Sequence, residues 1–421
     1  FMKKFLGLSI TLFCFLLKAD ETNILDTILS CRQIQKTDSL AKECTALIRP
    51  AVRGRFFTAD RPIFHYYPGL RIVLPWMALA DLPTPVRKMG VLGEELGHAE
   101  LYLKEDGLTG AGIGGNKLRK METILADAIN QGAREVVTFG CIGSNLVATV
   151  CYCAAKIGLQ CSVHLKPQPL SHVVQNNLLL DHAYGARMYF YPNNELRGYG
   201  AMHEALQTKF ETGLFPYAIP TGASNERGAT AYVNAGFELK EQIEREALPK
   251  PDYIFIPVGS MGTVSGLALG LAAAGLGDIE IIAVATEQDD YQTAFLKQTT
   301  ECNQFLNTLD SNFPLFDVQT LKVSFEMGFA GEAYGQFTEA CVDAIHLFED
   351  LERVKLEGTY TGKAAAGMIH NLKNDLRYKD KVVLFWNTFG IHNVVDEPYY
   401  YKYLPRAFHQ FFEQDVQVLD Q

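Results

Sequence analysis

The strongest constraint on the fold is a regular alternation of short apolar segments with helix-length segments through most of the chain. The apolar runs are rich in β-branched residues and most end near Gly or Pro, which is typical of buried strands. They cover residues 135–139, 160–165, 187–190, 253–257, 279–285 and 382–388, and the helix-length segments cover residues 117–130, 146–157, 229–246 and 363–372. This alternation predicts an α/β fold with twisted, mainly parallel sheets and helices on both faces. Ligands in such folds bind at the carboxyl ends of the strands, so chemistry is expected in the turns that follow them.

The composition describes a folded protein with room for more than one domain. Of the 421 residues, 48% are apolar and 20% are charged, which excludes a disordered or fibrous chain. A chain of this length forms two or three domains, or one large α/β unit with a subdomain. The 48 acidic residues outnumber the 38 basic ones, and the sequence contains no run of five basic residues. Because neutralising phosphates needs clustered cations, we expect no nucleic-acid partner.

The first residues have the pattern of a targeting segment. Residues 2–4 (Met-Lys-Lys) precede an apolar run over residues 5–17, and residues 18–20 interrupt it. A charged start followed by a short apolar run is typical of a secretory signal peptide, here with cleavage after Ala19. The run is too short for a membrane span, so we expect no integral span in the mature chain. The location is periplasmic or secreted if this signal is cleaved, and cytoplasmic if the segment is instead an apolar helix of the folded protein.

The nine cysteines indicate neither a disulfide framework nor a metal site. Their number is odd, and the sequence contains no CxxC pair and no HExxH. Cys151 and Cys153 lie two residues apart in a predicted helix, so their thiols point to different faces. We therefore expect ordinary buried thiols and no bound metal.

Two glycine-rich segments match nucleotide-binding motifs only in part. Residues 110–115 contain GxGxxG, but several residues separate them from a candidate strand at 101–104, and no acidic residue ends the next strand. Residues 358–364 resemble a phosphate loop but have three residues between the glycines and lack the final Ser or Thr. We therefore expect neither a dinucleotide nor ATP as ligand.

A stronger set of motifs combines an amine, a polar turn and a phosphate-binding loop. Lys117 follows two glycines and Asn116 at a predicted helix start near other cations, which favour its neutral, aldehyde-reactive form; a solvated basic helix start is the alternative. Ser144 and Asn145 follow a predicted strand, where they either cap the next helix or reach a ligand. Residues 259–263 follow another strand, and successive amides at a helix N-terminus favour a phosphate. These are the parts required for pyridoxal phosphate (PLP).

Five short motifs occur in a fixed order along the chain. They are GNKLRK at 115–120, GSN at 143–145, TGASN at 221–225, GSMGT at 259–263 and EGTYTGK at 357–363. This set resembles the 1-aminocyclopropane-1-carboxylate (ACC) deaminase/D-cysteine desulfhydrase family, and the resemblance extends over residues 79–396. That family belongs to the tryptophan synthase β-like, fold-type-II PLP enzymes. The resemblance implies PLP as the cofactor, a small amino acid as substrate and a homodimer.

The resemblance also implies a two-domain organisation. Residues 76–119 and 231–400 form the large PLP-binding domain, residues 120–230 the small domain, residues 20–75 an N-terminal extension with a candidate helix at 24–35, and residues 401–421 a C-terminal tail, after the candidate signal peptide at 1–19.

The resemblance assigns cofactor contacts to individual residues. Lys117 holds the cofactor as a Schiff base, Asn145 bonds its ring hydroxyl, and Thr361 stands beside its ring nitrogen. The phosphate is held by the loop Gly259, Ser260, Met261, Gly262 and Thr263.

The catalytic and substrate contacts follow from the same resemblance. Lys117 carries the proton on one face of the cofactor. Ser144, with Asn145 beside it, binds the substrate carboxylate or assists proton transfer, and Tyr360 lies close to the reacting carbons. The alternatives are a helix cap for Ser144 and a core aromatic for Tyr360. Phe329 belongs to the segment that resembles the family's substrate-binding tyrosine segment.

Three positions bear on the substrate. Thr361 stands where the deaminase branch has a carboxylate and the desulfhydrase branch a threonine, so it favours the less demanding elimination of sulfide. Phe329 falls where the deaminase has a catalytic tyrosine, and a phenyl ring cannot donate a proton. Gly143 stands where many relatives have glutamine, so a contact near the substrate is lost or moved.

These observations predict a PLP-dependent lyase. The expected reaction is β-elimination from a small D-amino acid, similar to that of D-cysteine desulfhydrase, which yields a 2-oxo acid, ammonia and sulfide. The alternatives are ACC deamination or amino-acid racemisation on the same scaffold, and a non-catalytic protein that binds an amino acid or PLP.

Overall fold

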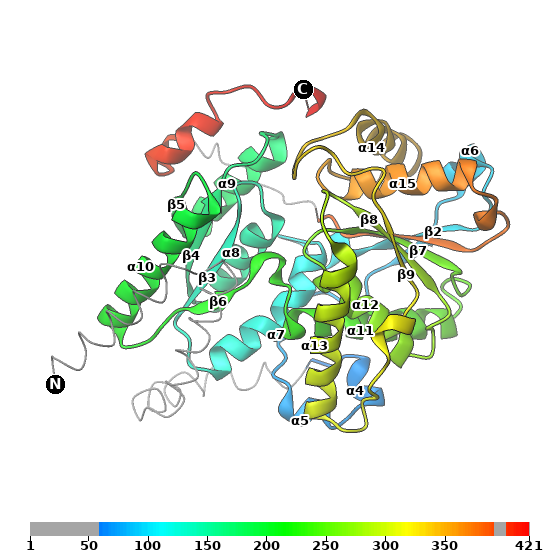
Figure 1. Cartoon of the computed structure of the whole chain (residues 1–421), viewed down its shortest axis with the longest axis horizontal. Coiled ribbons are helices and arrows are strands. Elements are labelled where there is room, and N and C mark those ends of the chain that lie inside the picture. The colour runs from blue at the N-terminus through cyan, green and yellow to red at the C-terminus, as the bar shows by residue number, and fades with distance from the viewer. Residues whose placement is uncertain (1–58, 391–400, 421) are drawn as a thin grey trace.

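A computed structural model describes residues 59–390 and 401–420. The predicted signal peptide and the candidate helix at residues 24–35 lie outside the described residues. The described chain forms two sheets that lie beside one another, each flanked by helices (Figure 1). The predicted α/β fold with parallel sheets is therefore confirmed.

The larger sheet has the strand order β1-β2-β10-β7-β8-β9 and the smaller has β5-β4-β3-β6. Neighbouring strands are parallel throughout, except that β1 is antiparallel to β2. The strands are β1 (Val86–Lys88), β2 (Leu101–Glu105), β3 (Glu135–Cys141), β4 (Gln160–Lys166), β5 (Arg187–Phe190), β6 (Tyr217–Ile219), β7 (Tyr253–Val258), β8 (Glu280–Ala285), β9 (Val323–Glu326) and β10 (Val383–Asn387). The two sheets agree with a large and a small domain, whose boundaries stay a prediction.

The six strands expected from the sequence correspond to β3, β4, β5, β7, β8 and β10, and the candidate strand at 101–104 is β2. The strands that the sequence pattern did not predict are β1, β6 and β9. Each of these lies at the edge of its sheet and has three or four residues. Segments this short carry too few residues to show a periodic pattern.

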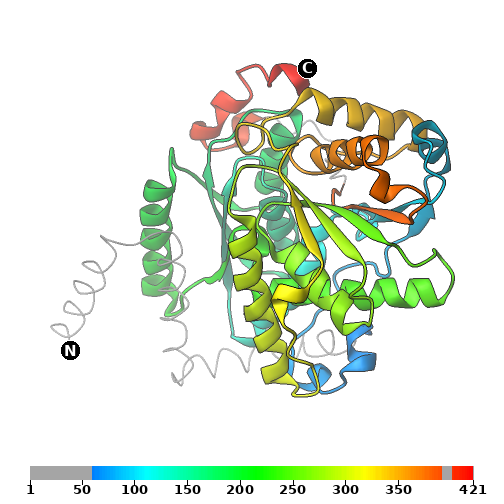
Figure 2. The same cartoon turned by 45° about the vertical axis from the view of Figure 1, so that its right-hand side comes forward.

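Helices cover both sheets (Figures 1 and 2). The four helices expected from the sequence are α7 (Asn116–Asn130), α8 (Asn145–Ile157), α11 (Glu226–Glu244) and α15 (Thr361–Asn374). The others are α4 (Ile63–Tyr66), α5 (Leu70–Val73), α6 (Gly90–Leu96), α9 (His172–Ala183), α10 (Asn194–Thr212), α12 (Gly262–Ala273), α13 (Tyr291–Leu309) and α14 (Glu339–Glu352). Within residues 59–390 and 401–420, no helix is both long and apolar enough to cross a membrane.

The central strands of the large sheet are apolar on both faces. In β7, Ile254 and Ile256 belong to one core cluster, whereas Phe255 between them belongs to another. Phe385 in β10 shares the second cluster, and its neighbour Trp386 lies in the first. Successive side chains of a strand point to opposite faces, so a sheet buried on both sides needs an unbroken apolar run. This explains why these strands were visible in the sequence.

Four buried ionic side chains join the elements that surround the start of α7. Arg119 of α7 donates to Asp106 at 2.7 Å and to Glu238 of α11 at 2.8 Å. Lys104 of β2 also pairs with Glu238. All four side chains are at least 98% buried. The charges balance, so each buried ion has an opposite partner, as the cost of desolvation requires.

Neutral donors complete this network. Trp386 of β10 donates to Asp106 at 2.9 Å, and Tyr232 of α11 donates to the same carboxylate. The backbone amide of Thr84 donates to Glu238 at 3.0 Å. The network therefore fixes β2, β10 and α11 around the first turn of α7, two residues after Lys117.

The C-terminal segment, red in Figure 1, runs past β5 and α9 and ends on the side of α14. Phe408 and Phe411 pack against Phe190 of β5. The backbone amide of Gln417 donates to the carbonyl of Leu170 at 2.9 Å. Its side chain accepts from the amide of residue 337 at 2.8 Å and donates to the carbonyl of residue 335 at 3.1 Å. Gln417 therefore links a loop of each sheet.

Replacing Glu238 should destabilise the fold. Glu238→Gln leaves Lys104 and Arg119 with one buried carboxylate between them, so we expect a loss of about 3–5 kcal/mol in the free energy of unfolding. Guanidinium unfolding followed by tryptophan fluorescence measures this. Glu244→Gln is the control, since Glu244 lies on the same helix but is exposed, in a 3.4 Å pair with Lys240. Equal losses in the two variants would contradict a structural role of the network.

Candidate active site

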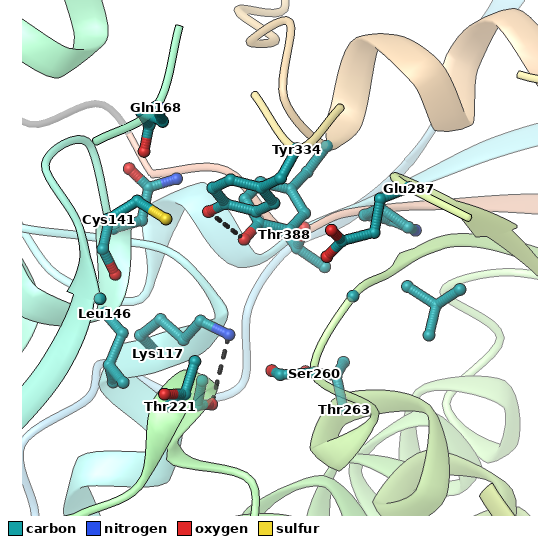
Figure 3. A pocket seen from close by; sticks show the side chains of 18 of the residues that line it. Lys117, Cys141, Leu146, Gln168, Thr221, Ser260, Thr263, Glu287, Tyr334 and Thr388 are labelled. Atoms are coloured by element: carbon teal, nitrogen blue, oxygen red, sulfur yellow. Dashed lines mark hydrogen bonds between the residues drawn. The ribbon is translucent and has the colours of Figure 1, made fainter. Parts of the chain in front are cut away.

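A cavity of about 500 Å³ lies at the carboxyl ends of the strands, between the two sheets (Figure 3). Most of the residues predicted from the sequence line it. They are Lys117, Ser144, Asn145, Gly259, Ser260, Met261, Thr263 and Tyr360. Three predicted residues are not among those that line it, namely Gly262, Phe329 and Thr361. The structure thus brings together motifs that are up to 243 residues apart in the sequence.

Lys117 lies in the first turn of α7 and points to the centre of the cavity (Figure 3). Gly115 before it has a φ of +97°, and a side chain there would lie 3.0 Å from the carbonyl of Thr388. Glycine therefore permits the turn that presents the lysine. The Lys117 amine lies 3.4 Å from the carbonyl of Gly222. The amine faces the cavity but is surrounded by protein atoms, and this burial lowers the pKa of Lys117 to about 8.

Hydroxyl and amide groups below Lys117 form a small polar cradle. Ser224 and Ser260 share a hydrogen bond of 2.9 Å, and the amide of Gly262 donates to Ser224 at 3.1 Å. Asn116 donates to Thr263 at 3.2 Å. A Cβ at Gly262 would lie only 2.8 Å from the Ser224 hydroxyl, so glycine keeps this space open. Gly262 contributes its amide at the start of α12 rather than a surface of the cavity.

A buried cation lies beside the cradle. Lys120 is fully buried, and its amine donates to the carbonyl of Gly222 at 3.1 Å. Burial, together with the nearby charge of Lys117, lowers the pKa of Lys120 well below its ordinary value. Among the described residues, no carboxylate pairs with Lys120. A buried cation without an acidic partner, beside the N-terminus of α12, fits a phosphate group.

Ser144 and Asn145 lie at the start of α8. The Ser144 hydroxyl accepts from the amide of Val147 at 3.4 Å, so it caps the helix and lines the cavity at once. Asn177 of α9 donates to the Asn145 side-chain oxygen at 2.9 Å and to the carbonyl of Gly143 at 3.0 Å. The Ser144 proton and the Asn145 amide nitrogen stay available to a ligand, so capping and ligand binding are compatible.

Two phenols meet at the cavity wall. The hydroxyls of Tyr334 and Tyr360 lie 2.6 Å apart (Figure 3). Burial raises the pKa of both groups well above the ordinary value, so both phenols are protonated at neutral pH. Tyr334 was not predicted from the sequence. Tyr360 lines the cavity and is therefore not only a core aromatic.

The structure does not bring Phe329 to the cavity. Its ring lies 5.4 Å from that of His370 and packs beside Gly367, on α15. Tyr334, five residues later, lines the cavity instead. The phenol that seemed missing from this segment is therefore present, and Phe329 gives no argument against ACC deamination.

Thr361 and Glu357 form a closed turn at the start of α15. The Thr361 hydroxyl is buried and accepts from the amide of Glu357 at 2.9 Å. The Glu357 carboxylate accepts from the amides of Thr359, Tyr360 and Thr361 at 2.8–3.0 Å and lines the cavity. Burial raises the pKa of Glu357 in spite of these donors. The role of Thr361 toward the cofactor ring stays a prediction.

Several further residues of the cavity were not identified from the sequence. Cys141, Lys166, Gln168, Arg197, Glu287 and Tyr334 all line it. Cys141 and Lys166 are the last residues of β3 and β4, and Glu287 closely follows β8. Their position after parallel strands was the signal that could have found them. The described residues contain no group of three or more His, Cys, Asp or Glu side chains that could hold a metal.

Comparison with known proteins identifies the family. A family described as pyridoxal-phosphate dependent enzyme matches residues 77–388. The chain belongs to this family. D-cysteine desulfhydrase of Salmonella newport is 32% identical over 325 residues, which cover 75% of this chain and 94% of that protein. Dependence on PLP, expected from Lys117 and the phosphate loop, is therefore confirmed.

Solved structures of other PLP enzymes share the fold. The crystal structure of an ACC deaminase homologue is 28% identical, with a TM-score of 0.67 over 79% of this chain and 96% of that one. A fungal L-serine ammonia-lyase from Rhizomucor miehei is 20% identical, with a TM-score of 0.52 over 75% of this chain and 95% of that one. The fold-type-II architecture predicted from the resemblance is confirmed.

The amine of Lys117 should titrate at an unusually low pH. In the cofactor-free protein, the reactive neutral form should rise with pH through a midpoint of about 8, because burial disfavours the charged form. Ordinary lysines titrate near about 10.4. Competitive labelling with an amine-reactive reagent, read by peptide mass spectrometry, measures the midpoint. A Lys117 profile that coincides with the surface lysines would contradict the burial argument.

Removing the charge of Lys120 should have opposite effects on cofactor binding and on stability. Lys120→Met should raise the dissociation constant for PLP at least about 30-fold, since one partner of a buried charge pair is lost. The same change should stabilise the cofactor-free protein, because a buried unpaired cation is removed. Equilibrium dialysis and thermal unfolding measure the two effects. Lys156→Met, at an exposed position of α8, is the control; unchanged PLP affinity in Lys120→Met would contradict the proposed phosphate site.

Proposed function

We propose that this chain catalyses β-elimination from a small D-amino acid, with D-cysteine as the first candidate. The products are a 2-oxo acid, ammonia and sulfide. The observation that carries the proposal is the shared cavity of the Lys117 amine and the Tyr334–Tyr360 pair. The similarity of the chain to D-cysteine desulfhydrase of Salmonella newport supports the choice of substrate.

Different residues of the cavity would hold the cofactor and act on the substrate. Lys117 would hold the cofactor, and Ser224, Ser260, Thr263 and Lys120 would bind its phosphate. When bound, PLP withdraws the electron pair that remains when the substrate Cα loses its proton. The protein must then remove that proton, orient the substrate and protonate the leaving group.

Lys117 is the base. The pKa of about 8 gives the Lys117 amine a larger neutral, proton-accepting fraction near neutral pH than an ordinary lysine has, and efficient general bases have a pKa close to the operating pH. Its amine points into the cavity, where the substrate Cα would lie.

The two tyrosines supply protons on the other side. Their 2.6 Å contact uses one hydroxyl proton, so the pair retains one proton for the substrate. That proton can reach the sulfur as the bond between Cβ and sulfur breaks. The remaining three-carbon product takes up water and releases ammonia, which balances D-cysteine and water against pyruvate, ammonia and hydrogen sulfide.

ACC deamination is the second candidate. It is favoured by the presence of Tyr334 in the cavity, where a phenol can protonate carbon as well as sulfur. Racemisation would need only proton exchange between Lys117 and the phenol pair. The three reactions differ in products, since ACC gives 2-oxobutyrate and racemisation gives the opposite enantiomer without ammonia. A homodimer stays a prediction for each.

D-cysteine should yield sulfide and pyruvate in equal amounts with the PLP-loaded protein. Lys117→Ala should reduce this turnover by at least about 1,000-fold, because general base and cofactor anchor are lost together. Sulfide and pyruvate assays, with ammonia and 2-oxobutyrate measured in parallel on ACC, give the result. Lys156→Ala should keep wild-type activity. Formation of 2-oxobutyrate without sulfide would replace the proposal by the deaminase alternative.

A further inference from the structure

Gln168 lies in the short loop between β4 and α9, between two prolines. Its side-chain oxygen accepts from the backbone amide of Gly143 at 3.1 Å. It also lines the cavity, on the side opposite Ser260 and Thr263 (Figure 3). The carboxamide is therefore fixed beside the turn that carries Ser144.

Two glycines form the space that the Gln168 carboxamide occupies. A Cβ at Gly143 would lie 2.9 Å from the Gln168 nitrogen and 2.6 Å from a methyl of Val174. A Cβ at Gly335, which has a φ of +79°, would also lie 2.9 Å from that nitrogen. Gly143 lies in the loop after β3 of the smaller sheet and Gly335 in the loop after β9 of the larger sheet, so the amide nitrogen stands where the two sides of the cavity meet.

The orientation leaves one group unused. The Gln168 side-chain oxygen already accepts a hydrogen bond from Gly143. The Gln168 side-chain nitrogen carries two protons that it can donate. In the part of the chain that the structure describes, no hydrogen bond satisfies them. The Gln168 nitrogen is half-buried, held in place and open to the cavity. It can therefore donate hydrogen bonds to an acceptor group of a ligand.

The position of the Gln168 nitrogen indicates which group of the ligand it binds. The phosphate cradle of Ser224, Ser260 and Lys120 lies across the cavity, so a phosphate is not the partner. An amino-acid substrate bound beside Lys117 would carry its carboxylate as its fixed anion. Ser144 directly follows Gly143 and offers a second donor on the same side.

We propose that Gln168 binds the carboxylate of the amino-acid substrate together with Ser144, and that Gly143 and Gly335 exist to make room for it. This assignment rests on the proposed function, since it requires an amino acid as ligand. It also accounts for Gly143, where many relatives have glutamine: the amide reaches the same turn from the neighbouring loop. Gln168 is thus a substrate-binding residue of this chain.

The test compares two ligands that differ only in the carboxylate. D-alanine has the carboxylate but no leaving group, and ethylamine is the same molecule without it. Their dissociation constants are measured on the PLP-loaded protein from the change in cofactor absorbance. Gln168→Ala should weaken D-alanine about tenfold or more and leave ethylamine within about twofold. Gln168→Glu should weaken D-alanine at least as much through repulsion, and Gln207→Ala, exposed on α10, should change neither.

Equal weakening of both ligands would overturn the proposal, because it would show a structural role. Unchanged binding of D-alanine would also overturn it. With D-cysteine, Gln168→Ala should raise KM about tenfold with kcat within about threefold, since the lost contact is present before and during the reaction. The wild type releasing no sulfide would contradict the proposed reaction. If Gln168→Ala then still weakens the binding of D-alanine but not that of ethylamine, the carboxylate contact stands.

Discussion

The rest of the structure depends on the buried ionic network around Arg119. Arg119 and Lys104 balance Asp106 and Glu238, and these four residues come from β2, the turn after it, α7 and α11. Buried charges tolerate little displacement, because each lost ion pair leaves an unpaired ion in a medium of low dielectric constant. The network therefore fixes the first turn of α7, and with it the direction of Lys117. The role proposed for Lys117, an amine that meets a cofactor held at another helix, requires a support of this stiffness.

The cavity is lined by residues from both sheets, with basic groups on one side and an acidic group on the other. Burial lowers the proton affinity of both the Lys117 and Lys120 amines, and the charge of Lys117 lowers that of Lys120 further, whereas Glu357 is a buried carboxylate held by three backbone amides. The cations lie beside the phosphate cradle and the carboxylate lies beside the phenols. Such separation lets one small space bind an anion at one end and keep proton donors protonated at the other.

The loops that close the cavity depend on small, specific contacts. Gln417 links the loop of Leu170 to the loop of Gly335, and Gln168 fills the gap between Gly143 and Gly335. These contacts lie where the two sheets meet. Tyr334 precedes Gly335, so the C-terminal segment also helps to place the phenol pair. In the proposed reaction, substrate recognition is thus shared by the motifs of the fold and by the chain's own loops.

The sequence by itself determined the buried strands and the helices between them, and it singled out Lys117 and the loop at residues 259–263, because each depends on local periodicity or on a turn followed by a helix start. It did not predict three of the short edge strands, β1, β6 and β9, whose three or four residues show no clear pattern. Only the tertiary structure decided that Tyr334 and not Phe329 faces the cavity, that the Thr361 hydroxyl bonds Glu357, and that Gln168 stands beside Gly143. These outcomes depend on how distant segments pack, and packing is a property of the whole chain that no single segment encodes.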